Sequence, residues 1–153
     1  GFRIHHYCLM NIHFHLAASI PNLDGFSHGM ANVKREYTKW FNRTYRRTGP
    51  LWRERFRSML IEHDSYLHAC GLYIENNPVK AGLVEKSTDW IYSSAQFYES
   101  NLADSLVDSY ELPFVEKINR MDEGSFTRGN IIGSELFKLQ MSEEAFQDEP
   151  VPA

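Results

Sequence analysis

One apolar run near the start of the chain decides the fold, and it comprises Tyr7-Cys8-Leu9-Met10-Asn11-Ile12-His13-Phe14-His15-Leu16-Ala17. This run predicts strands over residues 2–10 and 13–19, interrupted near Asn11. Because side chains alternate between the two faces of a strand, His13 and His15 share one face, about 7 Å apart at Cα. Two imidazoles at this spacing suit one divalent metal ion, and an ordinary pair of polar-face histidines would produce the same pattern.

A long amphipathic helix is predicted after a turn at residues 19–25. Its apolar and aromatic residues recur every three or four positions, at Met30, Val33, Tyr37, Trp40, Phe41 and Tyr45. Ser27 is the expected N-cap, and Gly49-Pro50 stops the helix. The less periodic segment 51–61 is expected to be a loop that leads into a strand.

A second helix is predicted from Asp64 or Ser65, either of which can cap it, up to Pro78. Farther on, Ser93 and Ser94 indicate a turn into another short helix. The two segments 112–118 and 134–141 are weaker helix candidates.

Length and composition favour one domain with an appendage. The chain has 153 residues, 42% of them hydrophobic, which is enough for one core. Its two cysteines, Cys8 and Cys70, form no close-spaced metal or redox motif and indicate reduced thiols. No apolar run approaches the roughly 20 residues that span a bilayer, so we expect no membrane partner and a cytoplasmic protein.

Charge is distributed unevenly along the chain. Residues 34–57 contain two acidic residues, Glu36 and Glu54, and nine basic ones, a balance of +7: Lys34, Arg35, Lys39, Arg43, Arg46, Arg47, Arg53, Arg55 and Arg57. Six aromatic residues, Trp52 among them, are interleaved with these cations. This combination suits single-stranded nucleic acid, so the nine cations and Trp52 are candidate DNA-binding residues. A solvated amphipathic helix with core aromatics is the simpler alternative.

The C-terminal third is acidic instead. Residues 99–153 hold twelve acidic and four basic residues, a balance of −8, which disfavours contact with a phosphate backbone. We therefore expect a domain over residues 1–98 and an acidic, helical or irregular extension over 99–153, with a disordered tail from about 147.

The predicted second helix carries the candidate nucleophile. Tyr73 and Asn77 are four residues apart and therefore neighbours on one helical face. A phenol there could attack phosphorus while a metal held by the two histidines and Asn77 polarised the phosphate. A half-buried packing role for Tyr73 and a helix C-cap role for Asn77 are the structural alternatives. His5 and His6 are expected to be edge or surface residues.

Four motifs, in this order, resemble those of the single-tyrosine HUH transposases, and most of all the REP-associated tyrosine transposases of the IS200-like superfamily. They are His13-Phe14-His15, Gly49-Pro50-Leu51-Trp52-Arg53-Glu54-Arg55-Phe56, Tyr73-Ile74-Glu75-Asn76-Asn77-Pro78-Val79-Lys80-Ala81-Gly82-Leu83-Val84 and Asp89-Trp90-Ile91-Tyr92-Ser93-Ser94. The resemblance covers about residues 2–98. It implies a ferredoxin-like α+β fold, an antiparallel sheet with helices packed on it.

The resemblance also implies a chemistry. It makes Tyr73 the nucleophile of a 5′-phosphotyrosine intermediate, His13 and His15 the metal pair, Asn77 the third ligand and Mg²⁺ or Mn²⁺ the cofactor. Single-stranded or hairpin DNA is the implied partner. The chain departs from the family pattern in having Met10-Asn11-Ile12 before the first histidine and no counterpart of the first strand and helix. A missing strand fits a fragment or degraded element, or a homodimer in which a second copy supplies the strand.

Three hypotheses follow. The chain is a metal-dependent enzyme that cleaves and rejoins single-stranded DNA, a domesticated or inactive relative that binds such DNA without cutting it, or an unrelated RNA-binding or metal-binding α+β module.

Overall fold

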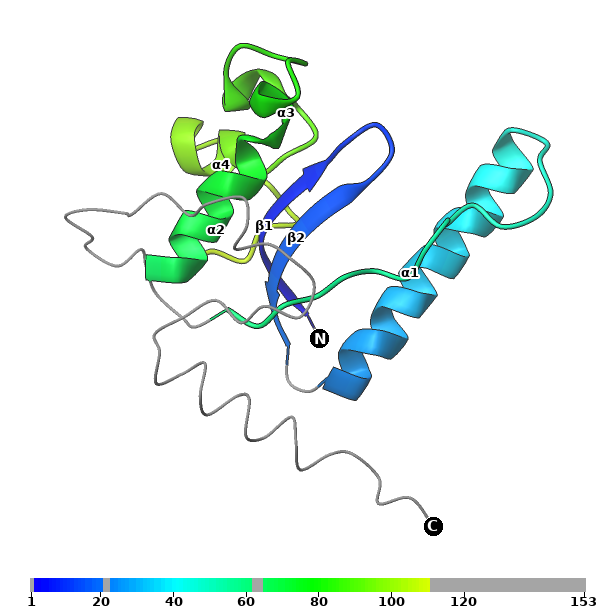
Figure 1. The fold of residues 1–153 in the computed structure, drawn as a ribbon. Coiled ribbons are helices and arrows are strands. Elements are labelled where there is room, and N and C mark those ends of the chain that lie inside the picture. Colours follow the sequence, from blue (N-terminus) through cyan, green and yellow to red (C-terminus); the bar gives the residue numbers. More distant parts are fainter. Residues whose placement is uncertain (1, 21–22, 62–64, 111–153) are drawn as a thin grey trace. The chain divides into compact units, whose positions relative to one another are not determined.

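The computed structural model describes residues 2–20, 23–61 and 65–110, and the fold is α+β (Figure 1). Two strands, β1 (Arg3–Leu9) and β2 (Phe14–Ser19), form the sheet seen in this part of the chain. They are joined by a tight hairpin in which the Met10 N–H donates to the His13 carbonyl at 2.8 Å. The predicted interruption near Asn11 is therefore this turn.

The helices follow in chain order: α1 (Leu23–Thr44), α2 (Ser65–Glu75), the single turn α3 (Asn77–Lys80), a 3-10 turn (Ser87–Asp89) and α4 (Ala95–Ser100). The chain divides into two compact units. One contains residues 18–57, with α1 and the segment after it. The other contains residues 4–17 together with the described residues from 58 to 110.

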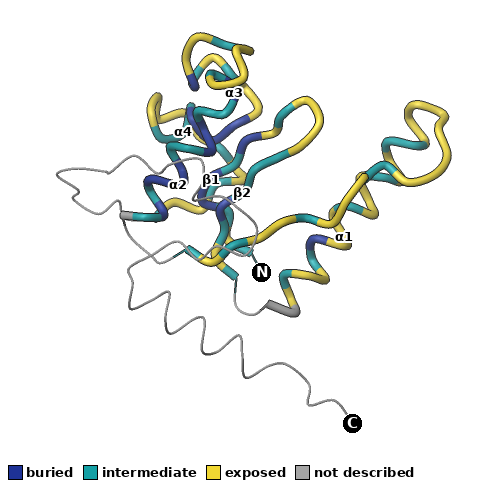
Figure 2. The backbone as a smooth tube through the Cα atoms, viewed as in Figure 1, coloured by how far each residue is buried: buried dark blue, intermediate teal, exposed yellow. Residues whose placement is uncertain are grey.

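In the second unit, α2 packs on the hairpin through a small apolar core. Its buried members are Cys8, Ala17, Leu67, Cys70 and Ile74. Figure 2 shows burial concentrated on β1, α2 and the segment that leads into α4, whereas α1 is exposed along most of its length. Both cysteines are buried and free.

The edge of β1 that faces away from β2 is hydrogen-bonded as well. Cys8 forms an antiparallel bridge with Ser93, and the Leu9 N–H donates to the Tyr92 carbonyl at 2.8 Å. Near the start of the strand, the Asp108 N–H donates to the Ile4 carbonyl at 2.7 Å. Segments far along the chain therefore form hydrogen bonds with β1, and Asp108 of the acidic extension is one of them.

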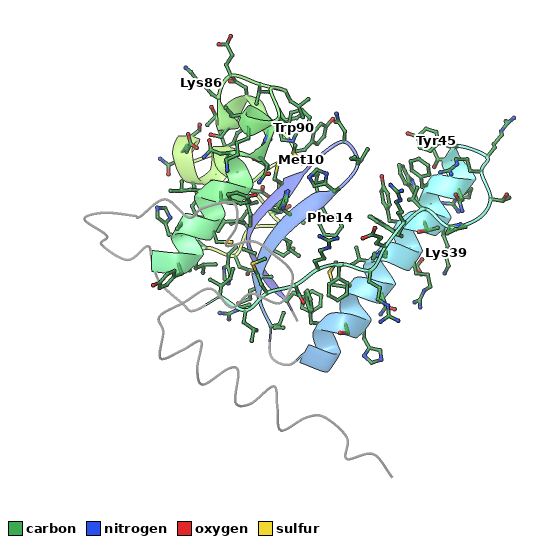
Figure 3. The ribbon with its side chains drawn as sticks, in the orientation of Figure 1. Met10, Phe14, Lys39, Tyr45, Lys86 and Trp90 are labelled. Carbon is green, nitrogen blue, oxygen red and sulfur yellow. The ribbon has the colours of Figure 1, made fainter. Side chains whose placement is uncertain are left out.

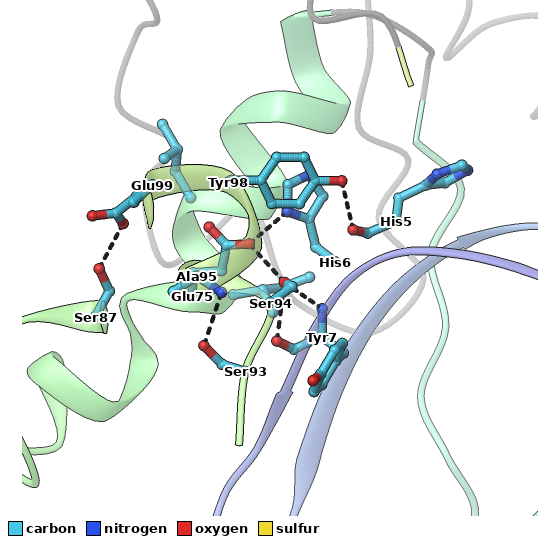
Figure 4. A network of polar contacts seen from close by, with 12 residues as sticks. His5, His6, Tyr7, Glu75, Ser87, Ser93, Ser94, Ala95, Tyr98 and Glu99 are labelled. Atoms are coloured by element: carbon cyan, nitrogen blue, oxygen red, sulfur yellow. Dashed lines mark hydrogen bonds and ion pairs between the residues drawn. The ribbon is translucent and has the colours of Figure 1, made fainter. Parts of the chain in front are cut away.

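A buried polar network ties α2 to β1 (Figure 4). His6 Nδ1 donates to Glu75 Oε1 at 2.8 Å, and the Ser94 hydroxyl donates to the same oxygen at 2.6 Å. His6 and Glu75 are each 1% exposed. The other imidazole nitrogen, Nε2, lies 2.7 Å from the Tyr110 hydroxyl, and the Tyr98 ring stacks on the imidazole with centroids 4.4 Å apart. Both imidazole nitrogens of His6 and the Oε1 atom of Glu75 thereby gain hydrogen-bond partners.

This network corrects the prediction for the first two histidines. His5 and His6, expected at an edge or surface, are 7% and 1% exposed. Both imidazoles pack against the Tyr110 ring, with centroids 5.3 Å away for His5 and 5.6 Å away for His6. His5 Nδ1 lies 2.8 Å from the Asp108 carbonyl, again a contact with the far end of the described chain.

Two helix predictions hold with altered ends. The long helix starts at Leu23, four residues before the expected N-cap Ser27. The second helix ends at Glu75, and Pro78 lies in the first turn of α3, where its missing N–H costs no hydrogen bond. The short helix expected after Ser93 and Ser94 is α4, with Ser94 at its N-cap.

The loop predicted over residues 51–61 is confirmed for residues 51–60, and Ile61 makes an isolated β-bridge where the strand was expected to begin. The weaker helix candidates 112–118 and 134–141 and the tail from 147 lie outside the described residues. No helix in the described ranges is both long and apolar enough to cross a membrane.

Candidate functional site

The hairpin brings the two predicted metal-binding histidines together. His13 ends the turn and His15 lies in β2, and their ring centroids are 5.0 Å apart with the rings nearly perpendicular. With metal–nitrogen bonds of about 2.1 Å and a ligand angle of about 90°, the rings that share a metal have centroids about 4.5–5 Å apart. The pair is therefore spaced to hold one ion without rearrangement of the backbone.

The two histidines differ in their surroundings. His13 is exposed, whereas His15 is partly buried. Burial, and after it the charge of His13, lowers the pKa of His15 below its ordinary value. His15 is therefore neutral at pH 7, and the neutral imidazole is the form that binds metal.

Packing of α2 on the hairpin brings Tyr73 to the same place. Its ring centroid lies 6.4 Å from that of His15, with the rings nearly perpendicular. Tyr73 is partly buried and packs against the apolar core. The predicted nucleophile and the predicted metal pair therefore meet, although 58 positions separate Tyr73 from His15 in the sequence.

Asn77 shapes the end of the helix that carries Tyr73. Its side-chain Nδ2 donates to the carbonyls of Tyr73 at 2.9 Å and of Ile74 at 3.2 Å. These carbonyls lie in the last turn of α2 and lack partners within the helix, so Asn77 is the C-terminal cap that the sequence suggested as an alternative. With the nitrogen used in this way, the amide oxygen is the atom that Asn77 would present to a metal.

The donor set fits a divalent ion with an amide as the third ligand. Within residues 2–20, 23–61 and 65–110, no three His, Cys, Asp or Glu side chains are grouped to hold a metal. A site on His13 and His15 would therefore need a third ligand of another type, such as the amide oxygen predicted at Asn77. A ligand set of imidazole nitrogens, an amide oxygen and water is compatible with Mn²⁺. It is less favourable for Mg²⁺, because Mg²⁺ prefers oxygen ligands to nitrogen.

Sequence reasoning missed a cation at this site. The Lys80 Nζ lies 4.0 Å from the centroid of the Tyr73 ring. Lys80 follows Tyr73 by seven positions, and residues at i, i+4 and i+7 share one face of a helix. That spacing was the available signal, and the intervening Pro78 concealed it by suggesting that the helix had ended.

The predicted DNA-binding residues belong to the other compact unit. Eight of the nine cations are exposed, and Lys34 is intermediate. Some of their charge is already paired, since Glu36 contacts both Arg35, at 3.3 Å, and Lys39, at 2.9 Å. These exposed ion pairs are weak and would yield readily to phosphate. Figure 3 labels Lys39 on α1 and Tyr45 just after the end of that helix.

The aromatic residues of this unit divide into two kinds. Trp52 is partly buried, with its indole N–H donating to the Lys34 carbonyl at 2.9 Å and the Lys34 ammonium 5.1 Å from its ring centroid. Tyr37, Trp40 and Tyr45 are 45%, 45% and 58% exposed and offer the more accessible stacking surfaces. The sequence suggested six aromatic residues for stacking and placed Trp52 among the DNA-binding candidates, because the exposure of each ring could not be judged from the sequence.

Comparison with known proteins identifies the class of this α+β domain. A family model described as "Transposase IS200 like" matches residues 1–77. The chain therefore belongs to the IS200-like transposase family. It is 37% identical over 98 residues to a Haemophilus influenzae protein named "Putative REP-associated tyrosine transposase", an alignment that covers 57% of this chain and 55% of that protein. The chain thus spans about half the length of this curated relative. No solved structure gives a significant match.

Proposed function

We propose that this chain cleaves and rejoins single-stranded DNA near hairpin ends through a 5′-phosphotyrosine on Tyr73. The convergence of Tyr73 with the His13 and His15 pair, 6.4 Å and 5.0 Å between successive ring centroids, is the observation that carries this proposal. Family membership supports it and removes the hypothesis of an unrelated RNA-binding or metal-binding module. We expect the reaction to take place in the cytoplasm.

The covalent step exchanges one phosphodiester for another. The Tyr73 hydroxyl gives its proton to solvent and its oxygen attacks phosphorus, forming the O–P bond while the bond from phosphorus to the 3′ oxygen breaks. The leaving 3′ oxygen takes a proton, and rejoining is the reverse attack by a 3′ hydroxyl. His13, His15 and Asn77 would hold the ion. A bound Mg²⁺ or Mn²⁺ supplies Lewis-acid polarisation of the phosphate and stabilisation of the leaving oxygen.

Covalent trapping tests the nucleophile. A hairpin with a single-stranded flank is labelled at its 3′ end, because a 5′-phosphotyrosine retains the downstream fragment. A protein–DNA band on a denaturing gel is expected with wild type and Mn²⁺, and none is expected with Tyr73→Phe. Tyr92→Phe is the matched control, since Tyr92 is an exposed tyrosine of the same unit. An equal band from Tyr73→Phe would refute the assignment.

Metal binding is measured without the reaction. Titration with Mn²⁺ followed by electron paramagnetic resonance should show one site that is lost in His15→Ala and in Asn77→Ala. His28→Ala, an exposed histidine in α1, is the control and should bind as wild type does. Undiminished binding by His15→Ala would place the metal elsewhere.

DNA binding without cleavage is the second candidate function. The exposed cations of residues 34–57, with the accessible rings of Tyr37, Trp40 and Tyr45, support binding independently of Tyr73. Under this alternative, hairpin DNA is retained on a native gel with chelator present, and no covalent band forms under any metal condition.

A further inference from the structure

Lys80 lies against the face of the candidate nucleophile. Its Nζ is 4.0 Å from the Tyr73 ring centroid, well within the distance of a cation–π contact. The side chain is exposed, so the ammonium can be approached from solvent. Such contacts contribute little at an exposed site and are readily exchanged for a stronger partner.

The local backbone holds Lys80 in this position. Asn77 caps α2 through the Tyr73 carbonyl, and Pro78 is buried at the start of α3. The Lys80 N–H donates to the Asn76 carbonyl at 3.0 Å, which completes the single turn of α3. Tyr73, Asn77 and Lys80 therefore stay on one face across the break between the two helices.

We propose that the Lys80 ammonium binds a non-bridging oxygen of the phosphate that Tyr73 attacks, as a further catalytic residue. This inference rests on the proposed function. A phosphorus bonded to the phenol oxygen lies just beyond the rim of the ring, within the reach of the flexible four-carbon lysine side chain. A charge-assisted hydrogen bond to phosphate is stronger than the cation–π contact that it would replace.

Electrostatics gives Lys80 a role that the histidines do not fill. The imidazole nitrogens of His13 and His15 would be used by the metal, so neither histidine is available to contact the phosphate oxygens. Lys80 brings a positive charge with three donors. Negative charge on the phosphate oxygens shifts during attack, and a fixed cation beside them stabilises the transition state. Lys80 stays protonated throughout and transfers no proton.

The test separates catalysis from binding. The rate of covalent adduct formation is measured at saturating protein, in a single turnover, with the 3′-labelled hairpin, and affinity is measured by fluorescence anisotropy without divalent metal. We expect Lys80→Met to lower the rate by on the order of 100-fold. Its dissociation constant should change less than about threefold, since one phosphate contact among many is lost. Lys80→Arg should keep most of the rate. Lys86→Met, an exposed lysine of the same segment (Figure 3), is the control.

A modified substrate decides whether Lys80 acts on the phosphate oxygen. A methylphosphonate at the scissile position removes the charged oxygen, so wild type and Lys80→Met should react with it at similar rates. A Lys80→Met rate within about threefold of wild type on normal DNA overturns this inference and leaves the proposed function standing. An equal loss on normal and methylphosphonate DNA shows a merely structural role and also overturns it. If the wild type forms no adduct, the proposed function fails and this inference fails with it.

Discussion

Removing the Glu75 carboxylate should destabilise the fold more than any exposed acidic substitution. Glu75 Oε1 accepts from His6 Nδ1 at 2.8 Å and from the Ser94 hydroxyl at 2.6 Å, and all three side chains are buried. Glu75→Ala leaves both donors without this acceptor and opens a void between α2 and β1. The Glu75→Ala substitution therefore weakens the contact between α2 and β1 that Figure 4 shows.

The size of the effect follows from these contacts. Breaking a buried pair by removing one partner costs about 3–5 kcal/mol, so we expect Glu75→Ala to lower the free energy of unfolding by about 4 kcal/mol. For a domain of this size that corresponds to a fall in Tm on the order of 10 °C. Glutamine keeps the acceptor oxygen and nearly the same volume, so Glu75→Gln should cost only about 1 kcal/mol.

Urea unfolding followed by circular dichroism and tryptophan fluorescence measures both variants. Glu85→Ala, at an exposed position after α3, is the control and should stay within about 0.5 kcal/mol of wild type. A Glu75→Ala loss below about 1 kcal/mol would refute the argument, because the donors would then have found other partners. Glu75→Gln as unstable as Glu75→Ala would refute the claim that the acceptor geometry matters. If Glu75→Ala does not fold, Glu75→Gln still decides between these outcomes.

Three further predictions concern packing and protonation in the same unit. Gly71→Ala should lower the free energy of unfolding by about 2–3 kcal/mol, because its Cβ would overlap the His6 imidazole. Gly82→Ala, at a φ of +66° with open space around it, should lower the free energy of unfolding by only about 1 kcal/mol in the same assay. Burial raises the pKa of Cys70 to about 12 and that of Cys8 to about 11, so iodoacetamide at pH 8 should alkylate the folded chain at least about 100-fold more slowly than the urea-unfolded chain, and comparable rates would contradict the burial. The pKa of His15 is lowered in the folded state, so the unfolded chain takes up a proton at this residue first as the pH falls below about 6.5. The free energy of unfolding should therefore decline from pH 7 to pH 5. His15→Gln should make this decline smaller.

Structural features that depend on residues close together in the sequence could be predicted. The hairpin follows from two apolar runs around Asn11, and α1 from its three-and-four spacing, since both patterns depend on neighbours within a few residues. The meeting of Tyr73 with His15 was hypothesised from the chemistry of these side chains and implied by the family resemblance, because nothing local says which face of α2 packs on which strand.

Features set by distant partners could not be predicted. His6 is buried because Glu75 and Tyr110, 69 and 104 positions away, supply its hydrogen bonds. On sequence grounds alone a strand histidine near a chain end is better placed at the surface.

Helix α2 carries both the candidate nucleophile, Tyr73, and a member of the buried polar network, Glu75. The geometry of this helix explains why the network matters for the candidate site. Glu75 comes two positions after Tyr73, about 200° around the helix, so the two side chains point in nearly opposite directions. Gly71 and Glu75 share the face against His6, and Gly71 must lack a side chain for the helix to approach that ring. Any rotation or lifting of α2 that moved Tyr73 away from His15 would also break the hydrogen bonds of Glu75. The buried pair therefore fixes the orientation of the helix, and through it the place of the candidate nucleophile beside the histidines.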